Sequence, residues 1–272
     1  MANLQFTKMH GLGNDFIVIA TDDTDALPTA TLWRALADRH TGIGFDQALV
    51  ILPPRQTDAT AYYRIFNADG SESEQCGNGV RCVAEWLRLQ GRTNASALKL
   101  DSLGGRVEAK FVKSGVVAVN MGVPRFTSPG ESTLQVDEKE ILFTEISIGV
   151  PHIVLQVSSV DEAPVSTLGA RLESHQRFPQ RTNVGFLEVI DRAHARLRVF
   201  ERGVGGETRA CGTGACAAMA SARRQGLLEA EAEIALPGGA LQLRWQGEGS
   251  NVWMTGPAAV VFSGEVDLSQ LA

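Results

Sequence analysis

The stretch "EQCGNGVRCVAEW", from Glu74 to Trp86, places a cysteine directly before a segment with the period of a helix. Apolar residues recur at helical spacing from Val80 to Leu87, which predicts a helix that follows Cys76. Glycines next to the cysteine keep the space around its thiol free of side chains. The sequence therefore predicts a thiol at the N-terminus of a helix.

A second stretch, "RACGTGACAAMA" from Arg209 to Ala220, repeats this arrangement around Cys211. The alanine-rich segment from Ala215 to Gln225 predicts a second helix, which stops near Gly226. Small side chains suit a helix that is enclosed by strands. Each Cys-Gly-x-Gly unit is thus expected to open one central helix.

The two Cys-Gly-x-Gly units belong to a longer internal repeat. Four segments recur in the same order in both halves, at offsets of 136, 141, 134 and 135 residues. They are "GNDFIVI" with "GVPHIVL", "TGIGFDQALVI" with "RTNVGFLEVI", "YRIFNADG" with "LRVFERGVG", and "CGNG" with "CGTG". Four matches in one order are hard to attribute to chance, so we expect two homologous domains.

The remaining pattern is mostly that of strands, because short runs rich in β-branched residues are punctuated by Gly, Pro, Asn or Asp. Further helices are predicted in "TATLWRALADRH" and, more weakly, in "TLGARLESH". The predicted fold class is α+β, with two pseudo-symmetric domains that each wrap a curved β-sheet or barrel around a central helix. The boundary between the domains is expected near Asn120.

Composition excludes several classes of function. The chain has 272 residues, 44% of them hydrophobic, and a net charge of -6, which argues against a nucleic-acid-binding surface. No apolar run is long enough to span a bilayer, and the N-terminal sequence lacks a secretory pattern. A soluble cytoplasmic protein is therefore expected. Its four cysteines are expected to be reduced thiols.

A thiol at a helix N-terminus lies in the positive end of the helix field, beside backbone N–H groups without intrahelical partners. Both features are expected to lower the pKa of the thiols of Cys76 and Cys211. The same N–H groups suit a carboxylate. Two such units, one in each domain, could flank a single carboxylate-bearing carbon. One thiolate would remove the α-proton and the other thiol would return a proton to the opposite face, which inverts the stereocentre.

Other readings of the cysteines compete with this one. A buried free cysteine is usually inert, and Cys82 and Cys216 fall inside the predicted helices, where packing is expected. No metal site is expected, because there is no CxxC pair and the five histidines are scattered. The five lysines include none after Lys139, and no phosphate loop accompanies them, which disfavours pyridoxal phosphate. We therefore expect no cofactor.

Seven motifs in combination resemble the diaminopimelate epimerase family, over nearly the whole chain: "KMHGLGNDF", "GIGFDQ", "RIFNADGSE", "QCGNGVRC", "RTNVGF", "ERG" and "ACGTGAC". The resemblance implies two domains that enclose the site in the cleft between them, and no cofactor. It also implies conversion of LL-diaminopimelate to the meso form, for lysine and peptidoglycan synthesis. Because the family's C-terminal tail returns to the first domain, the domains are expected at 1–120 with 265–272, and at 121–264.

The resemblance also assigns roles to residues. Cys76 and Cys211 match the catalytic acid/base cysteines, and His152 and Glu201 match positions that adjust thiol pKa values. Substrate contacts are expected at Asn14, Gln47, Asn67, Gly77, Asn78, Asn183, Glu201, Arg202, Gly212 and Thr213. Taken singly, the asparagines could cap backbone, Glu201–Arg202 could be a surface ion pair, and His152 could be a packed core residue. The expected partner is a small amino acid. Neither nucleic acid nor membrane is expected, and a homodimer is left open.

Two departures from the family pattern affect the second half. Val150 stands where the family usually has asparagine, which is expected to contact the distal end of the substrate. The second is length: Phe66 and Cys76 are 10 positions apart, whereas Phe200 and Cys211 are 11 apart. Diaminopimelate epimerisation is the leading interpretation. A racemase of the same family for another amino acid, such as histidine, is the alternative, and a catalytically silent binding protein is a third.

Overall fold

The computed structural model describes residues 3–24, 27–74 and 76–271. The chain forms two compact units. The N-terminal unit is Met1–Val119 with Gly256–Ala272, and the C-terminal unit is Asn120–Thr255. The predicted domain ranges also include residues 1–2, 25–26, 75 and 272, which lie outside the described residues.

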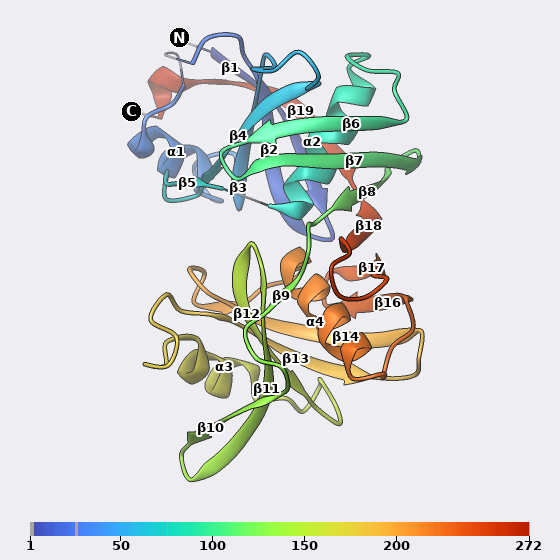
Figure 1. Cartoon of the computed structure of the whole chain (residues 1–272). Coiled ribbons are helices and arrows are strands. Elements are labelled where there is room, and N and C mark those ends of the chain that lie inside the picture. Colours follow the sequence, from blue (N-terminus) through green and yellow to red (C-terminus); the bar gives the residue numbers. More distant parts are fainter. Residues whose placement is uncertain (1–2, 25–26, 75, 272) are drawn as a thin grey trace. The chain divides into compact units, whose positions relative to one another are not determined.

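The N-terminal unit is built mainly of strands (Figure 1). Its strands are β1 (Asn3–Gly11), β2 (Asn14–Ala20), β3 (Gln47–Leu52), β4 (Ala61–Asn67), β5 (Glu72–Ser73), β6 (Ala97–Ser102), β7 (Gly105–Lys113), β8 (Val116–Asn120) and β19 (Ala259–Asp267). β1 and β2 form a hairpin, and β2 runs parallel to β3 after a crossover that contains α1 (Ala30–Ala37). β4 pairs antiparallel with β3 and β5 and parallel with β6, and β6, β7 and β8 form a meander.

The C-terminal unit repeats this topology. Its strands are β9 (Arg125–Phe126), β10 (Ser132–Val136), β11 (Lys139–Ile148), β12 (Val150–Gln156), β13 (Asn183–Val189), β14 (His194–Glu201), β15 (Gly206–Glu207), β16 (Glu231–Leu236), β17 (Gly239–Arg244) and β18 (Trp253–Pro257). β11 and β12 form the hairpin, and α3 (Val165–Glu173) lies in the crossover between the parallel strands β12 and β13. β14 pairs antiparallel with β13 and β15 and parallel with β16.

The strand registers confirm the predicted repeat and the α+β fold class. Ala48 of β3 faces Phe66 of β4, and Val184 of β13 faces Phe200 of β14 in the equivalent ladder. Gln47 therefore corresponds to Asn183, an offset of 136 residues. The offset of 141 predicted from the sequence for this segment was wrong. It aligned "TGIGFDQALVI" with "RTNVGFLEVI" by residue similarity, whereas the strand register gives 136.

Each unit encloses one central helix of 13 residues, α2 (Gly77–Leu89) and α4 (Gly212–Arg224). Residues 77–87 of α2 are all buried, and the helix packs against β1, β2, β3 and β7. α4 packs against β11, β12, β13 and β17, among other strands, and half of its buried residues are alanine. α4 begins three residues before the predicted start at Ala215, because Gly212 and Thr213 already belong to its first turn. The sequence therefore located both central helices.

The segment that returns to the N-terminal unit is longer than residues 265–272. β19 pairs antiparallel with β1 from Asn3 opposite Asp267 to His10 opposite Ala259, and Figure 1 shows the two strands side by side. A ladder of this length fixes both ends of the chain to one sheet. With the unit boundary at Gly256, residues 256–264 belong to the N-terminal unit, where the sequence had assigned them to the second domain.

Candidate active site

Cys76 is the N-cap residue of α2 and is partly exposed. Its Sγ accepts a hydrogen bond from the N–H of Gly79 at 3.4 Å, as an N-cap side chain does with the first helical turn. Its thiol also faces Asn14, whose Oδ1 lies 3.9 Å from Sγ. The same oxygen accepts a hydrogen bond from Nδ2 of Asn78 at 3.1 Å. The amide oxygen of Asn14 thus links two predicted site residues, Cys76 and Asn78.

Cys211 is the N-cap residue of α4 and is buried, with 4% of its surface exposed. Burial raises the pKa of its thiol well above the usual range, and the carboxylate of Glu201 raises it further; the Thr213 hydroxyl and the Gly214 N–H lower it by less. Glu201 is itself held by Thr208, whose Oγ1 donates to Oε2 at 2.8 Å. The predicted lowering of this thiol pKa was wrong, because burial outweighs the helix N-terminus.

The helix-start residues named by the sequence lie in the first turns of the two central helices. Gly77 and Asn78 begin α2, and Gly212 and Thr213 begin α4. Backbone N–H groups in a first helical turn have no intrahelical acceptor, so they can bind an anion. Each thiol therefore lies beside a group of donors that suits a carboxylate.

Gln47 and Asn67 form a second polar pair in the N-terminal unit. They face each other at the ends of β3 and β4, and Nε2 of Gln47 donates to Oδ1 of Asn67 at 2.8 Å. Nδ2 of Asn67 donates in turn to Oγ of Ser71 at 3.0 Å. In the C-terminal unit, Asn183 and Glu201 occupy the equivalent positions, one residue beyond the Val184–Phe200 pair.

Asn183 joins Arg202 to His152. Its Oδ1 accepts from the backbone N–H of Arg202 at 3.0 Å, and its Nδ2 donates to the carbonyl of Pro151 at 3.1 Å. Nδ2 also lies 3.4 Å from Nε2 of His152. The guanidinium of Arg202 donates to the carbonyl of Gln180 at 3.0 Å. Two predicted residues of this unit, His152 and Arg202, therefore meet at Asn183.

Val150 is the first residue of β12 and is partly buried, in the position that Asn14 has in β2. The side chain at this point of the repeat is therefore polar in one unit and apolar in the other.

The extra residue of the second repeat lies in the hairpin loop between β14 and β15. Glu72 faces Phe66 six positions away, whereas Glu207 faces Phe200 seven positions away. Both hairpins carry the same bidentate ion pair, from Arg64 to Glu72 and from Arg198 to Glu207. These matching pairs confine the added length to the loop, which begins at Arg202.

Sequence reasoning missed a charged network in the N-terminal unit, formed by Lys8, Asp15, Arg39 and Asp46. "GIGFDQ" contains Asp46, but nothing in that motif indicates that its side chain contacts Asn14. Within the described parts of the chain, no group of three His, Cys, Asp or Glu residues could hold a metal ion. No helix in those parts is long and apolar enough to cross a membrane.

Solved structures with the same fold include those of an epimerase and a probable racemase. A hydroxyproline epimerase from Agrobacterium vitis superposes with a TM-score of 0.75 at 17% identity, over 98% of this chain and 93% of that chain. A probable proline racemase from Agrobacterium radiobacter K84 superposes with a TM-score of 0.77 at 17% identity, over 97% and 93% of the two chains. At this identity the likeness defines the class of fold.

Closer relatives define the family. The family model described as diaminopimelate epimerase matches residues 6–127 and 144–261. A diaminopimelate epimerase from Ectopseudomonas mendocina (strain ymp) is 49% identical over 276 aligned residues, which cover 97% of this chain and 99% of that protein. The chain is an isomerase, and it belongs to the diaminopimelate epimerase family.

Proposed function

We propose that this chain epimerises LL-diaminopimelate to meso-diaminopimelate without a cofactor, for the synthesis of lysine and peptidoglycan precursors. The observation that carries the proposal is the equivalence of two thiols: Cys76 and Cys211 each cap the central helix of one repeated unit. The 49% identity to the diaminopimelate epimerase of Ectopseudomonas mendocina supports the choice of substrate.

In the proposed reaction the thiolate of one cysteine takes the proton from Cα, and the electron pair of that bond moves toward the adjoining carboxylate. The other thiol gives its proton to the opposite face of Cα. One C–H bond breaks and another forms, so no oxidant or reductant is needed. The raised pKa of Cys211 supports Cys211 as the proton donor in this direction, which leaves Cys76 as the base once the substrate is bound.

The first turns of α2 and α4 are proposed to hold the reacting carboxylate. Negative charge grows on this carboxylate as the proton leaves, and preorganised N–H donors stabilise it most at that point. Gly77, Asn78, Gly212 and Thr213 supply these positions. A Cβ at Gly214 would lie 3.1 Å from the Sγ of Cys211, so glycine leaves room beside that sulfur.

The remaining predicted residues are proposed to bind the substrate or to adjust the thiols. Glu201 raises the pKa of Cys211, which supports its role in keeping that thiol protonated. His152 is proposed to adjust the pKa of a catalytic thiol as a neutral ring, because burial and the charge of Arg202 lower the pKa of His152 to about 3. The contacts proposed for recognition of the amino acid come from Asn14, Gln47, Asn67, Asn183 and Arg202.

The sequence alternatives have less support. Racemisation of another amino acid such as histidine is not favoured, because the 49% identity extends over 97% of the chain. We propose a cytoplasmic location, where cysteines that form no disulfide stay reduced. The exposed apolar side chains of Val260, Val261 and Phe262 on β19 support the homodimer that the sequence left open. Sedimentation velocity tests this state.

The proposed function is tested with purified protein and two substrates in parallel. LL-diaminopimelate and L-histidine are incubated separately, and chiral chromatography follows the stereoisomers. We expect meso-diaminopimelate to form from the LL isomer, the LL isomer to form in the reverse reaction, and L-histidine to stay unchanged. Racemisation of histidine without any turnover of diaminopimelate would overturn the proposed substrate and leave the two-thiol chemistry standing.

A further inference from the structure

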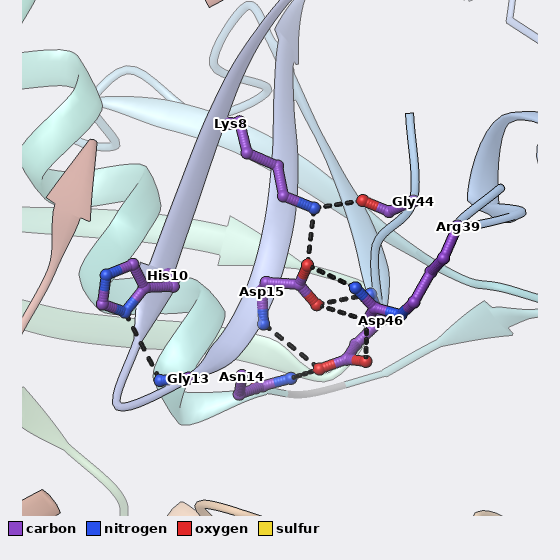
Figure 2. A network of polar contacts seen from close by, with 8 residues as sticks. All are labelled: Lys8, His10, Gly13, Asn14, Asp15, Arg39, Gly44 and Asp46. Atoms are coloured by element: carbon purple, nitrogen blue, oxygen red, sulfur yellow. Dashed lines mark hydrogen bonds and ion pairs between the residues drawn. The ribbon is translucent and has the colours of Figure 1, made fainter. Parts of the chain in front are cut away.

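The carboxylate of Asp46 is the centre of a polar network beside Asn14 (Figure 2). Its Oδ2 accepts from Nδ2 of Asn14 at 2.9 Å and from the backbone N–H of Asp15 at 3.1 Å. Its Oδ1 accepts from Nη2 of Arg39 at 2.8 Å. The contact with Asn14 is therefore one of three that engage both carboxylate oxygens.

This contact decides which way the amide of Asn14 faces. An ionised carboxylate only accepts hydrogen bonds, so the amide must present its nitrogen to Asp46. Its oxygen then faces the opposite way, toward Nδ2 of Asn78 at 3.1 Å and Sγ of Cys76 at 3.9 Å. Asp46 thus sets an acceptor beside the thiol.

The rest of the network holds Asp46 in place. Arg39 binds both carboxylate oxygens of Asp15, at 2.9 and 2.7 Å, as well as Asp46. The ammonium group of the buried Lys8 adds an ion pair to Asp15 at 2.5 Å and donates to the carbonyl of Gly44. Although burial opposes ionisation of Asp15, the hydrogen bonds from Arg39 and Lys8 lower its pKa to about 2. A charged, bidentate network of this kind is geometrically specific.

The C-terminal unit has none of these acidic groups at the equivalent places. Val150 corresponds to Asn14, Pro151 follows it where Asp15 follows Asn14, and Thr182 precedes Asn183 as Asp46 precedes Gln47. The C-terminal unit therefore lacks both the amide that corresponds to Asn14 and the carboxylates that correspond to Asp15 and Asp46. This pairing supports a link between the network and Asn14, since strand pairing itself is the same in both units.

We propose that Asp46 is a positioning residue that fixes the amide of Asn14 with its oxygen toward Cys76. Asp46 acts through Asn14 and does not itself contact the substrate. The inference rests on the proposed function in so far as Asn14 binds the substrate there. The orientation of the amide is a property of the free protein and can be measured without turnover.

A double-mutant cycle tests the proposal on LL-diaminopimelate. We expect Asp46→Asn to lower kcat/KM by about tenfold, mainly through a higher KM. An asparagine at position 46 can offer a donor as well as an acceptor, so the amide of Asn14 is free to turn and present its nitrogen in place of its oxygen. In the Asn14→Ala background, the same substitution should change kcat/KM by less than about twofold. Asp58→Asn is the matched control, because its carboxylate also pairs with two cations, Lys99 and Arg106, and it should leave kcat/KM unchanged.

A second measurement needs no turnover. Iodoacetamide labelling of Cys76, followed by peptide mass, is compared among the same variants without substrate. An acceptor beside the sulfur favours the thiol and an amide NH₂ favours the thiolate, so Asp46→Asn should speed labelling about threefold. In the Asn14→Ala background the rate should not respond to this substitution. If the wild type does not turn over diaminopimelate, the proposed function fails and labelling still tests the positioning.

Two outcomes would overturn the proposal. Unchanged kinetics and labelling in Asp46→Asn would mean that the carboxylate does not set the amide. Equal effects of Asp46→Asn with and without the Asn14 amide would mean that Asp46 acts through its charge or through the fold. Should Asp46→Asn fail to fold, Arg39→Gln replaces it, because this variant keeps the carboxylate and removes the cation that holds it. Arg39→Gln should lower kcat/KM about twofold, and this effect should also vanish in the Asn14→Ala background.

Discussion

Nδ2 of Asn183 lies 3.4 Å from Nε2 of His152, at facing positions of the parallel strands β12 and β13. The backbone N–H of Arg202 donates to the amide oxygen of Asn183, so the amide must turn its nitrogen toward the imidazole. An amide nitrogen only donates, which makes Nε2 of His152 the acceptor and the ring neutral. Burial and the charge of Arg202 lower the pKa of His152 to about 3, in agreement with this arrangement.

The first prediction concerns acid stability. Because the pKa of His152 is lowered in the folded protein, the unfolded chain binds a proton below about pH 6.5 that the folded protein does not bind. The free energy of unfolding should therefore decrease as the pH falls from about 6.5 toward 3, with a slope of at most about 1.4 kcal/mol per pH unit from this residue. Urea unfolding at several pH values should show a smaller slope for His152→Gln than for the wild type.

His194→Gln is the control for that comparison. His194 is exposed and pairs with Asp191 at the surface, so its removal should leave most of the slope in place. Identical pH dependence of the wild type and His152→Gln would show that His152 takes up its proton in the folded protein.

The second prediction concerns the two central cysteines. Cys76→Ala and Cys211→Ala should each lower the rate of inversion by about a thousandfold or more, because each face of Cα needs its own acid/base group. Cys82→Ala and Cys216→Ala are matched controls, since these cysteines lie on the same two helices and are fully buried. They should keep the rate of inversion within a few-fold of the wild type. Near-normal inversion in either Cys76→Ala or Cys211→Ala would exclude a two-base reaction.

The third prediction concerns the reactivity of the thiols of Cys76 and Cys211. Cys76 is partly exposed, whereas Cys211 is buried and its pKa is raised, so little of it is thiolate near pH 8. Iodoacetamide should therefore modify Cys76 about tenfold faster or more, as measured by peptide mass over time. Raising the pH should favour the labelling of Cys211. Faster modification of Cys211 at pH 8 would contradict its raised pKa.

The fourth prediction concerns Val150. Val150→Asn offers an amide to the distal end of diaminopimelate, and a neutral hydrogen bond contributes about 0.5–1.5 kcal/mol. The C-terminal unit has Thr182 where the other unit has Asp46, the carboxylate proposed to orient Asn14, so we expect only part of this gain. The KM for LL-diaminopimelate should fall about two- to threefold with little change in kcat. Val112→Asn, at an exposed position of β7, is the control and should change neither KM nor kcat. A higher KM in Val150→Asn would contradict the prediction and would indicate that the valine side chain packs on the substrate.

The sequence was sufficient for features that depend on local order. The two Cys-Gly-x-Gly units predicted where α2 and α4 begin to within a few residues, because capping and helix formation are decided by neighbours in the chain. The internal repeat predicted two units with one topology, because equivalent segments of sequence form equivalent strands. Family motifs added residues such as Asn183 and Glu201, which the structure finds at equivalent ladder positions to Gln47 and Asn67.

Features that depend on distant parts of the chain were not predictable. The raised pKa of Cys211 comes from burial by surrounding strands, which a helix N-terminus in the sequence does not reveal. The contact of Asp46 with Asn14 forms only because β2 and β3 run parallel and bring both residues to one end of the sheet. Arg39 and Lys8 reach the same point from other elements.

The central claim, that two thiols act on opposite faces of one carbon, is tested most directly by initial-rate turnover of LL-diaminopimelate in deuterium oxide. If two bases act, the meso product receives its α-hydrogen from a thiol equilibrated with solvent, while the removed proton stays on the other thiol. Mass spectrometry should then find deuterium in nearly all of the early meso product and almost none in the remaining LL substrate. Deuterium entering the recovered LL substrate as fast as the meso product would show that a single base serves both faces and would contradict this account.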